Sequence, residues 1–293
     1  SRKRTVVNIT AEGRRVISEQ EPSTARRKEG IIGPAPDPIV IHGRYSEIQE
    51  ILELVKEGRS TIISGLPGIG KSTLARAVSS DLDDLGWTIR WANCSLGTDV
   101  RSVGEMWLDK SSPSTIEAIV EALPMSKTLL VLDEAQELHP RHSKSIGDLV
   151  SEASSRCPVL LVVRAPNPLE IEEKFSDLRL EGLEAEHAVK LLFEGTDPNT
   201  AEAVSDSLGG HPLAIRLWTP EEGVPEKSKA VLDYVKDTVI SRLSEQGMKT
   251  LDELSIAPFP LGSEELNSEA GIAELDNSAV LKWSDELMET HHL

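Results

Sequence analysis

The segment Gly65-Leu66-Pro67-Gly68-Ile69-Gly70-Lys71-Ser72 decides the fold of this 293-residue chain. It fits the pattern G-x-x-x-x-G-K-[ST] without a mismatch. Glycines let the backbone curl so that successive N–H groups point at one anion. In this pattern the lysine reaches the β- and γ-phosphates of a nucleotide, and the following hydroxyl binds Mg²⁺. We therefore predict that a phosphate group is bound by Gly65, Pro67, Gly68, Ile69, Gly70, Lys71, Ser72 and Thr73.

The flanking residues supply the context that this pattern requires. Residues 60–64 read as a short buried strand, and residues 73–78 read as the start of a helix. A Gly-rich turn could match by chance, but a strand before the loop and a helix after it favour a true P-loop. The helix would also add the positive end of its dipole to the anion site.

A second motif follows about sixty residues after Lys71. The apolar run 128–132 ends in Asp133-Glu134, which is the Walker B form. We expect Asp133 to hold Mg²⁺ together with Ser72, and Glu134 to orient the attacking water as a base. A strand that ends in a solvated acidic turn would give the same letters. The spacing, however, fits one intervening strand at residues 87–93.

Composition narrows the class of protein. Hydrophobic residues make up 39% of the chain, which indicates a globular protein. No apolar run approaches the roughly 20 residues of a membrane span, and no secretory leader is visible. Cys94 and Cys157 lie in apolar, strand-like surroundings and are interpreted as buried reduced thiols. Together these features lead us to expect a cytoplasmic protein without membrane contact.

The charge is unevenly distributed along the chain. The net charge is −18, yet residues 1–33 carry eight Lys/Arg against four Asp/Glu. A basic start on an acidic body is compatible with an arm that contacts nucleic acid. A solvated tail would carry the same charge, and charge alone favours the tail.

Two further motifs resemble elements of the STAND and AAA+ ATPases, which belong to the ASCE class of P-loop NTPases. Ile41-His42-Gly43-Arg44, followed by a helix to about Lys56 with apolar positions Ile48, Ile51, Leu52 and Val55, resembles their "hhGRE" element. The resemblance implies that Ile41, Gly43 and Arg44 contact the adenine, although an ordinary loop-to-helix entry would look alike. Val163-Arg164 ends a buried strand where STAND ATPases place a Thr-Arg sensor. The Thr is missing here, and Arg164 is expected near the γ-phosphate or in a salt bridge at the sheet rim.

A third resemblance lies further along the chain. Ser207-Leu208-Gly209-Gly210-His211-Pro212-Leu213-Ala214-Ile215 resembles the "GGxPLA" motif of the NB-ARC and STAND group. In that group the proline contacts adenine from a helical lid, which implies such a role for Pro212. Helix capping alone would explain the glycines and the proline. Replication initiators of the origin-recognition type place a "sensor 2" arginine in this region, and Arg216 is a candidate for it.

The ends of the chain suggest flanking domains. Ile9-Thr10-Ala11-Glu12-Gly13-Arg14 resembles the last wing of a MarR-type winged helix, and an unstructured basic leader is the open alternative. The first residue is Ser, so we expect a chain cut from a longer protein. The C-terminal region is acidic and would repel DNA, which suggests a regulatory winged helix. There, the resemblance implies that His291 or His292 touches the ADP phosphate.

The predicted fold is α/β, with an ASCE/AAA-like parallel five-stranded sheet, a helical lid and a C-terminal winged helix. The expected domains are a winged-helix fragment at 1–20, a linker at 21–38, the P-loop domain at 39–182, the lid at 183–222 and the winged-helix-like region at 223–293.

The predicted function is a STAND-type signalling switch that binds ATP/ADP and Mg²⁺, hydrolyses ATP slowly and controls transcription. Its expected partners are nucleotide, other copies of itself and DNA through the N-terminal domain. ATP rather than GTP follows from the resemblance, and no Asn-Lys-x-Asp guanine motif is present. The alternatives are an AAA+ ATPase of the replication-initiator type with steady turnover, and a module that only scaffolds.

Overall fold

The computed structural model describes most of the chain after residue 29. The described residues are 30–109, 111–164, 167–171, 175–192, 195–227, 230–257, 259–277, 280–284 and 287–290. The expected winged-helix fragment at 1–20 and the histidines at 291 and 292 lie outside these residues.

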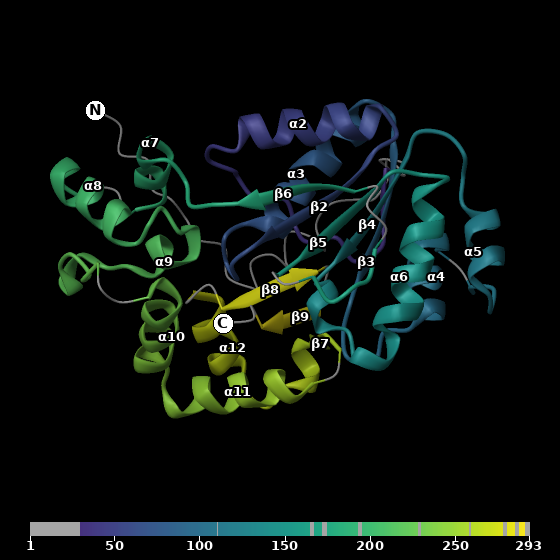
Figure 1. Ribbon diagram of the computed structural model, residues 1–293. Coiled ribbons are helices and arrows are strands. Elements are labelled where there is room, and N and C mark those ends of the chain that lie inside the picture. Colours follow the sequence, from purple (N-terminus) through teal and green to yellow (C-terminus); the bar gives the residue numbers. More distant parts are fainter. Residues whose placement is uncertain are drawn as a thin grey trace, which may run out of the picture.

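A parallel sheet occupies the centre of the molecule (Figure 1). Among the described residues it has six strands, in the order β1 (Ile31–Ile32), β3 (Thr88–Asn93), β4 (Thr128–Asp133), β5 (Val159–Val163), β2 (Ser60–Gly65) and β6 (Phe175–Leu180). Strands β4 and β5 are buried along their whole length, as a sheet covered on both faces requires. Their unbroken apolar sequences follow from this position.

The expectation of five strands was wrong by one. Ile31–Ile32, inside the stretch that we expected to be a linker, pairs in parallel with Ile89 and Arg90 of β3. The Ile89 amide also donates to the Gly30 carbonyl at 2.6 Å. A two-residue strand is too short to show any periodicity in the sequence. It forms because the outer edge of β3 would otherwise leave its hydrogen-bonding groups unpaired.

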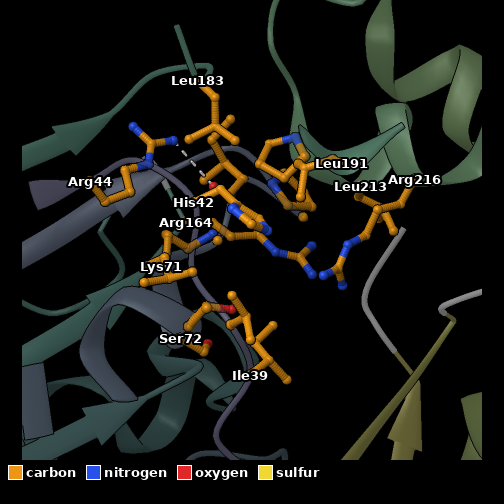
Figure 2. A pocket seen from close by; sticks show the side chains of 18 of the residues that line it. Ile39, His42, Arg44, Lys71, Ser72, Arg164, Leu183, Leu191, Leu213 and Arg216 are labelled. Atoms are coloured by element: carbon orange, nitrogen blue, oxygen red, sulfur yellow. Dashed lines mark hydrogen bonds between the residues drawn. The ribbon is translucent and has the colours of Figure 1, made fainter. Parts of the chain in front are cut away.

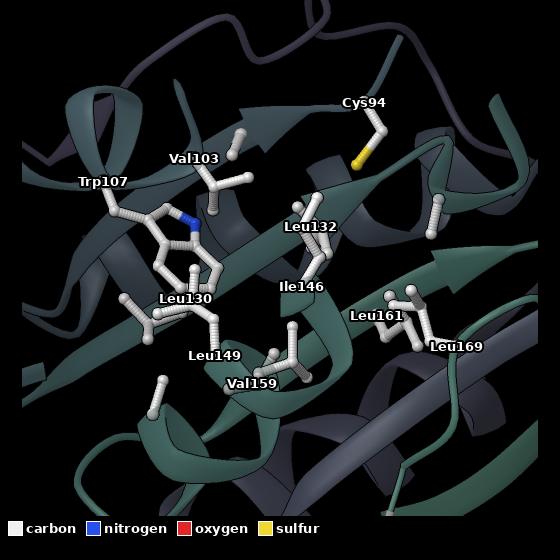
Figure 3. Close-up of a cluster of buried hydrophobic side chains, with 14 of the residues drawn as sticks. Cys94, Val103, Trp107, Leu130, Leu132, Ile146, Leu149, Val159, Leu161 and Leu169 are labelled. Atoms are coloured by element: carbon white, nitrogen blue, oxygen red, sulfur yellow. The ribbon is translucent and has the colours of Figure 1, made fainter. Parts of the chain in front are cut away.

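Helices cover both faces of this sheet. Helices α2 (Tyr45–Lys56) and α3 (Lys71–Asp84) pack one hydrophobic cluster against it. Helices α4 (Val100–Leu108), α5 (Ile116–Ala122) and α6 (Pro140–Ser154) pack a second cluster on the opposite face. Figure 3 shows this second cluster, in which Trp107 lies beside Leu130 and Leu149. The Trp107 indole N–H donates to the Val131 carbonyl at 3.0 Å, so its polar atom is satisfied inside the core.

The rest of the chain forms a second, mainly helical body beside the carboxyl ends of the strands (Figure 1). Its elements are α7 (Ala185–Ala188), α8 (Pro198–Ser207), α9 (Pro212–Leu217), α10 (Val231–Arg242), α11 (Glu245–Ile256), β7 (Leu261–Gly262), α12 (Glu269–Asn277), β8 (Leu281–Ser284) and β9 (Leu287–Thr290). The three strands form an antiparallel sheet in the order β7-β9-β8. Short 3₁₀ turns lie at Ala135–Glu137, Val189–Leu191, Pro220–Glu222 and Ser263–Glu265.

One hydrophobic cluster runs through this second body from Ala188 to Met288. Trp218, after α9, and Val239, on α10, are both 1% exposed within it. This cluster thus includes residues from both sides of residue 222, where we expected the lid to end.

The cysteines and the lengths of the helices also bear on the sequence-based expectations. Cys94 and Cys157 are buried and unbonded to each other. Within the described part of the chain, no helix combines the length and apolar character that crossing a membrane would need.

Candidate nucleotide-binding site

The phosphate-binding loop connects β2 to α3 at the carboxyl edge of the sheet. Gly68 has φ +70° and Gly70 has φ +98°, and an L side chain rarely adopts either value. A Cβ on Gly68 would also lie 2.7 Å from the Leu213 Cβ of the lid. The glycine at this position is therefore required both by the backbone and by the neighbouring helix α9.

Lys71 begins α3 and is largely buried. Its Nζ donates to the carbonyl oxygens of Gly65 at 3.2 Å and Leu66 at 2.9 Å. The cation is thus held within the loop itself. The P-loop pattern gives its lysine the role of reaching the β- and γ-phosphates, so this position suits a bound anion.

The two predicted metal ligands meet in the structure. The Ser72 hydroxyl donates to Asp133 Oδ1 at 3.1 Å, although 61 residues separate them in the chain. Asp133 ends β4 and is fully buried, and its Oδ1 also accepts from the Glu134 backbone N–H at 2.8 Å. A hydroxyl and a carboxylate side by side are the hard oxygen ligands that Mg²⁺ prefers. The residues present therefore fit a magnesium ion.

Glu134 lies next to this pair and lines the cavity. Its φ of +57° is unusual for a residue with a side chain and is typical of functional sites. The Gln136 amide donates to Glu134 Oε2, and Gln136 Oε1 accepts from the Arg164 backbone N–H at 3.0 Å. Gln136 therefore links the residue that follows β4 to the end of β5.

Arg164 lines the cavity, and its Nη2 lies 3.9 Å from Glu137 Oε1 at the rim of the sheet. Burial raises the pKa of Glu137, and the charge of Glu134 acts in the same direction, while Arg164 opposes them. The charges of Glu134, Glu137 and Arg164 therefore influence one another at this corner of the site.

The cavity has a volume of about 170 Å³ and lies between the sheet and the lid. Twelve residues predicted for the site line it: Ile41, Arg44, Pro67, Gly68, Ile69, Gly70, Lys71, Ser72, Thr73, Glu134, Arg164 and Pro212. Three do not line it. Asp133 lies beneath Ser72, Gly65 accepts a hydrogen bond from Lys71, and Gly43 packs against His187.

Arg44 does more than line the cavity. Its guanidinium donates to Glu47 at 2.9 Å, to the Ile69 carbonyl at 3.5 Å and to the Glu181 carbonyl. It therefore ties the start of α2 to the P-loop and to the end of β6. The Arg44 backbone is itself left-handed, with φ +71°, directly after Gly43 at φ +71°.

Seven further residues also line the cavity: Ile39, Val40, His42, Leu183, Leu191, Leu213 and Arg216. Of these, the sequence had suggested a role only for Arg216. The residues Ile39 and Val40 are 52% and 74% exposed beside the cavity. Exposed apolar side chains of this kind often mark a binding site, and the apolar run Ile39-Val40-Ile41 is visible in the sequence. Figure 2 shows the side chains of Arg164 and Arg216 reaching toward the middle of the cavity from the core and from the lid. Two cations that face one space are suited to an anion with several charges.

Comparisons with known proteins agree with this geometry. Residues 61–175 match the family model of the ATPase family associated with various cellular activities (AAA). This part of the chain is an AAA-type ATPase domain of the P-loop kind. No curated protein matches the sequence.

Solved structures give a likeness in fold. One is a Signal Transduction ATPase with Numerous Domains (STAND) protein with a tetratricopeptide repeat sensor from Pyrococcus horikoshii. It is 16% identical at a TM-score of 0.63, over 88% of this chain and 42% of that one. The present chain therefore spans less than half the length of that protein. The RuvB Holliday junction branch migration motor of Thermotoga maritima is 18% identical at a TM-score of 0.38, over 85% of this chain and 92% of that one.

Proposed function

We propose that this protein is a STAND-type switch that binds ATP and ADP with Mg²⁺ and hydrolyses ATP slowly. The observation that carries the proposal is the composition of the cavity wall. Lys71, Ser72 and Glu134 come from the core, whereas Pro212 and Leu213 come from the lid. A nucleotide held between them contacts both bodies, so its phosphate state can bias their relative position.

Each residue has a role in this proposal. Lys71 holds the β- and γ-phosphates, and Ser72 with Asp133 holds the Mg²⁺, which neutralises charge on the phosphate oxygens. Glu134 orients and deprotonates the attacking water. Arg164 faces the γ-phosphate. The adenine packs between the apolar run that ends at Ile41 and the lid residue Pro212.

The position of the cavity supports a gated reaction. Residues of the core and of the lid both line it, so a bound nucleotide would hold the two together, and its release would be slow. The Gln136 amide, which donates to Glu134 Oε2, would hold the carboxylate in a fixed orientation toward the attacking water.

The C-terminal part of the second body supports a regulatory domain. Helix α11, strand β7, helix α12 and the hairpin of β8 and β9 follow one another in the order of a winged helix. We propose that it packs on the lid instead of on DNA because its acidic surface repels phosphate. Transcriptional control would then act through the basic N-terminal residues.

Nucleotide binding is tested by calorimetry with ATP and ADP in Mg²⁺. Lys71→Ala should weaken binding by at least about tenfold, because it removes a buried cation from the phosphate site. Lys144→Ala, at an exposed position on α6, is the matched control. Unchanged affinity in Lys71→Ala would overturn the assignment of the site.

The switch is tested by the mass of the protein in solution. We expect a small species with ADP and a larger oligomer with a non-hydrolysable ATP analogue. Promoter fragments titrated at increasing salt test the DNA partner, since binding through basic residues must weaken with salt.

A second candidate is an AAA+ ATPase of the replication-initiator type, with steady turnover. Arg216 favours it, because this lid arginine lines the cavity where such proteins place a second sensor. Slow turnover with ADP retained through purification supports the switch. Rapid turnover by the isolated monomer supports the motor.

A further inference from the structure

His211 occupies the junction between the lid and the phosphate-binding loop. It is the N-cap residue of α9 and is only 2% exposed. A Cβ on Gly68 would lie 3.1 Å from the His211 Cε1, so the ring lies directly against the loop. Buried histidines normally have both ring nitrogens satisfied, and here both partners are identifiable.

The two hydrogen bonds define the form of the ring. His211 Nδ1 accepts from the Ala214 backbone N–H at 3.3 Å, so Nδ1 carries no proton. His211 Nε2 lies 2.8 Å from the Pro67 carbonyl oxygen, which can only accept, so Nε2 carries the proton. The ring is therefore a neutral donor toward the loop and an acceptor toward the lid helix. Burial lowers the pKa of His211 and the nearby charge of Lys71 acts in the same direction, while the bond to Pro67 opposes them; the net shift is downward, which favours the neutral ring.

The bonded carbonyl belongs to the peptide unit between Pro67 and Gly68. In a planar trans peptide the C=O and the N–H point in opposite directions. A bond from His211 to the Pro67 carbonyl therefore turns the Gly68 N–H away from the lid. With φ +70°, Gly68 has the conformational freedom that a rotation of this peptide would use. The bond from His211 to the Pro67 carbonyl holds this peptide in the orientation seen here.

We propose that His211 is a positioning residue that couples closure of the lid to the grip of the loop on the nucleotide phosphates. This inference rests on the proposed function, because it names how the two bodies at that site communicate. When the lid is closed, His211 holds the Pro67–Gly68 peptide in place and slows release of ADP. When the lid opens, the bond breaks and the peptide is released with it.

Two substitutions separate the two bonds of the ring. His211→Asn keeps an acceptor near the Nδ1 position, and Asn is a good N-cap, but its side chain is too short to reach the Pro67 carbonyl. His211→Gln places an amide N–H near the Nε2 position and is a poor N-cap. The first variant therefore removes the loop contact, and the second removes the cap.

The experiment measures the dissociation rate of a fluorescent ADP analogue in Mg²⁺ by stopped flow. One net hydrogen bond corresponds to about a three- to tenfold change in rate, so His211→Asn should release the analogue that much faster. His211→Gln should release it at close to the wild-type rate. Thermal melting without nucleotide shows whether each variant is folded, and His211→Gln should melt lower because it lacks the cap.

The outcomes are distinguishable. Equal rates for wild type and His211→Asn, or an equal acceleration in both variants, overturn the coupling while ADP binding by the wild type upholds the proposed site. Absence of ADP binding by the wild type overturns both. A nitrogen-detected NMR measurement of the nucleotide-free protein gives an independent readout, because it reports which ring nitrogen carries the proton. We expect the Nε2–H tautomer, and an Nδ1–H tautomer would refute the inference.

Discussion

The ends of the strands determine where the polar residues of the candidate site lie. Ser72 follows the loop after β2, and Asp133 ends β4, yet their oxygens lie 3.1 Å apart. Parallel strands bring their carboxyl ends to one edge, so two motifs that are distant in sequence form a single site. The spacing of the two motifs allowed this meeting to be predicted, although the hydrogen bond itself needed the structure.

Asp133→Asn tests the metal site at the scale of one residue. The amide keeps an acceptor for Ser72 and for the Glu134 N–H but removes the negative charge, so the fold should persist. We expect Mg²⁺ to strengthen nucleotide binding in the wild type, and this gain to fall by about 10–100-fold in the variant. Calorimetry with and without Mg²⁺ measures it. Asp148→Asn, at an exposed position on α6, is the control, and an unchanged Mg²⁺ effect in Asp133→Asn would contradict the site.

His211 should make stability depend on pH. Its pKa in the folded protein is lowered from the ordinary value of 6.5, chiefly by burial. Below pH 6.5 the unfolded chain then binds more protons at this residue than the folded chain does. The free energy of unfolding should therefore fall as the pH drops from 6.5 toward the folded pKa, and stay level above it.

Urea unfolding between pH 5 and pH 8 measures this effect, with His211→Asn as the reference. Other groups titrate equally in both proteins, so the difference between their pH profiles isolates His211. A constant difference across that range would show that the histidine does not titrate differently on folding.

At the scale of elements, periodicity predicted helices better than junctions. Ile48, Ile51, Leu52 and Val55 were expected on one face of a helix ending near Lys56, and all four are buried in α2, which ends there. The junction before α2 could not be predicted in the same way. The Arg44 backbone is left-handed, and its guanidinium donates to carbonyls 25 and 137 residues away.

Arg44→Ala should loosen the junction of α2, the P-loop and β6. It leaves the Ile69 and Glu181 carbonyls without their charged donor, so the free energy of unfolding should fall by about 1–3 kcal/mol. Urea denaturation is the measurement. Arg101→Ala is a suitable control because its pair with Glu105 is exposed and should be worth well under about 1 kcal/mol. Equal losses in the two variants would argue against the junction role.

At the scale of the molecule, the described residues pack into two bodies with separate hydrophobic cores. The sheet and its covering helices form one, and α7 to β9 share the other. The candidate cavity lies between them, so a ligand there contacts both.

Trp218→Ala tests whether the second body is one cooperative unit. Trp218 is 1% exposed, and its indole N–H donates to the Gly223 carbonyl at 2.7 Å. Its removal should destabilise that body by about 3–5 kcal/mol. Hydrogen exchange should then accelerate together in α8, α10 and α11, and remain slow in β4 and β5. Acceleration limited to the neighbourhood of α9 would mean that the lid and the C-terminal elements open separately.

The P-loop, the Asp133-Glu134 pair and the buried strands around them could be predicted from the amino-acid sequence. These features depend on local backbone geometry and on burial, which leave short patterns of glycine, charge and apolar residues. The folded chain was needed to see that Ile31–Ile32 joins the sheet, that Arg44 holds the loop, and that His211 bonds Pro67 across 144 residues. Such contacts leave no periodic trace, because they arise only after the sheet edge and the lid have been brought together.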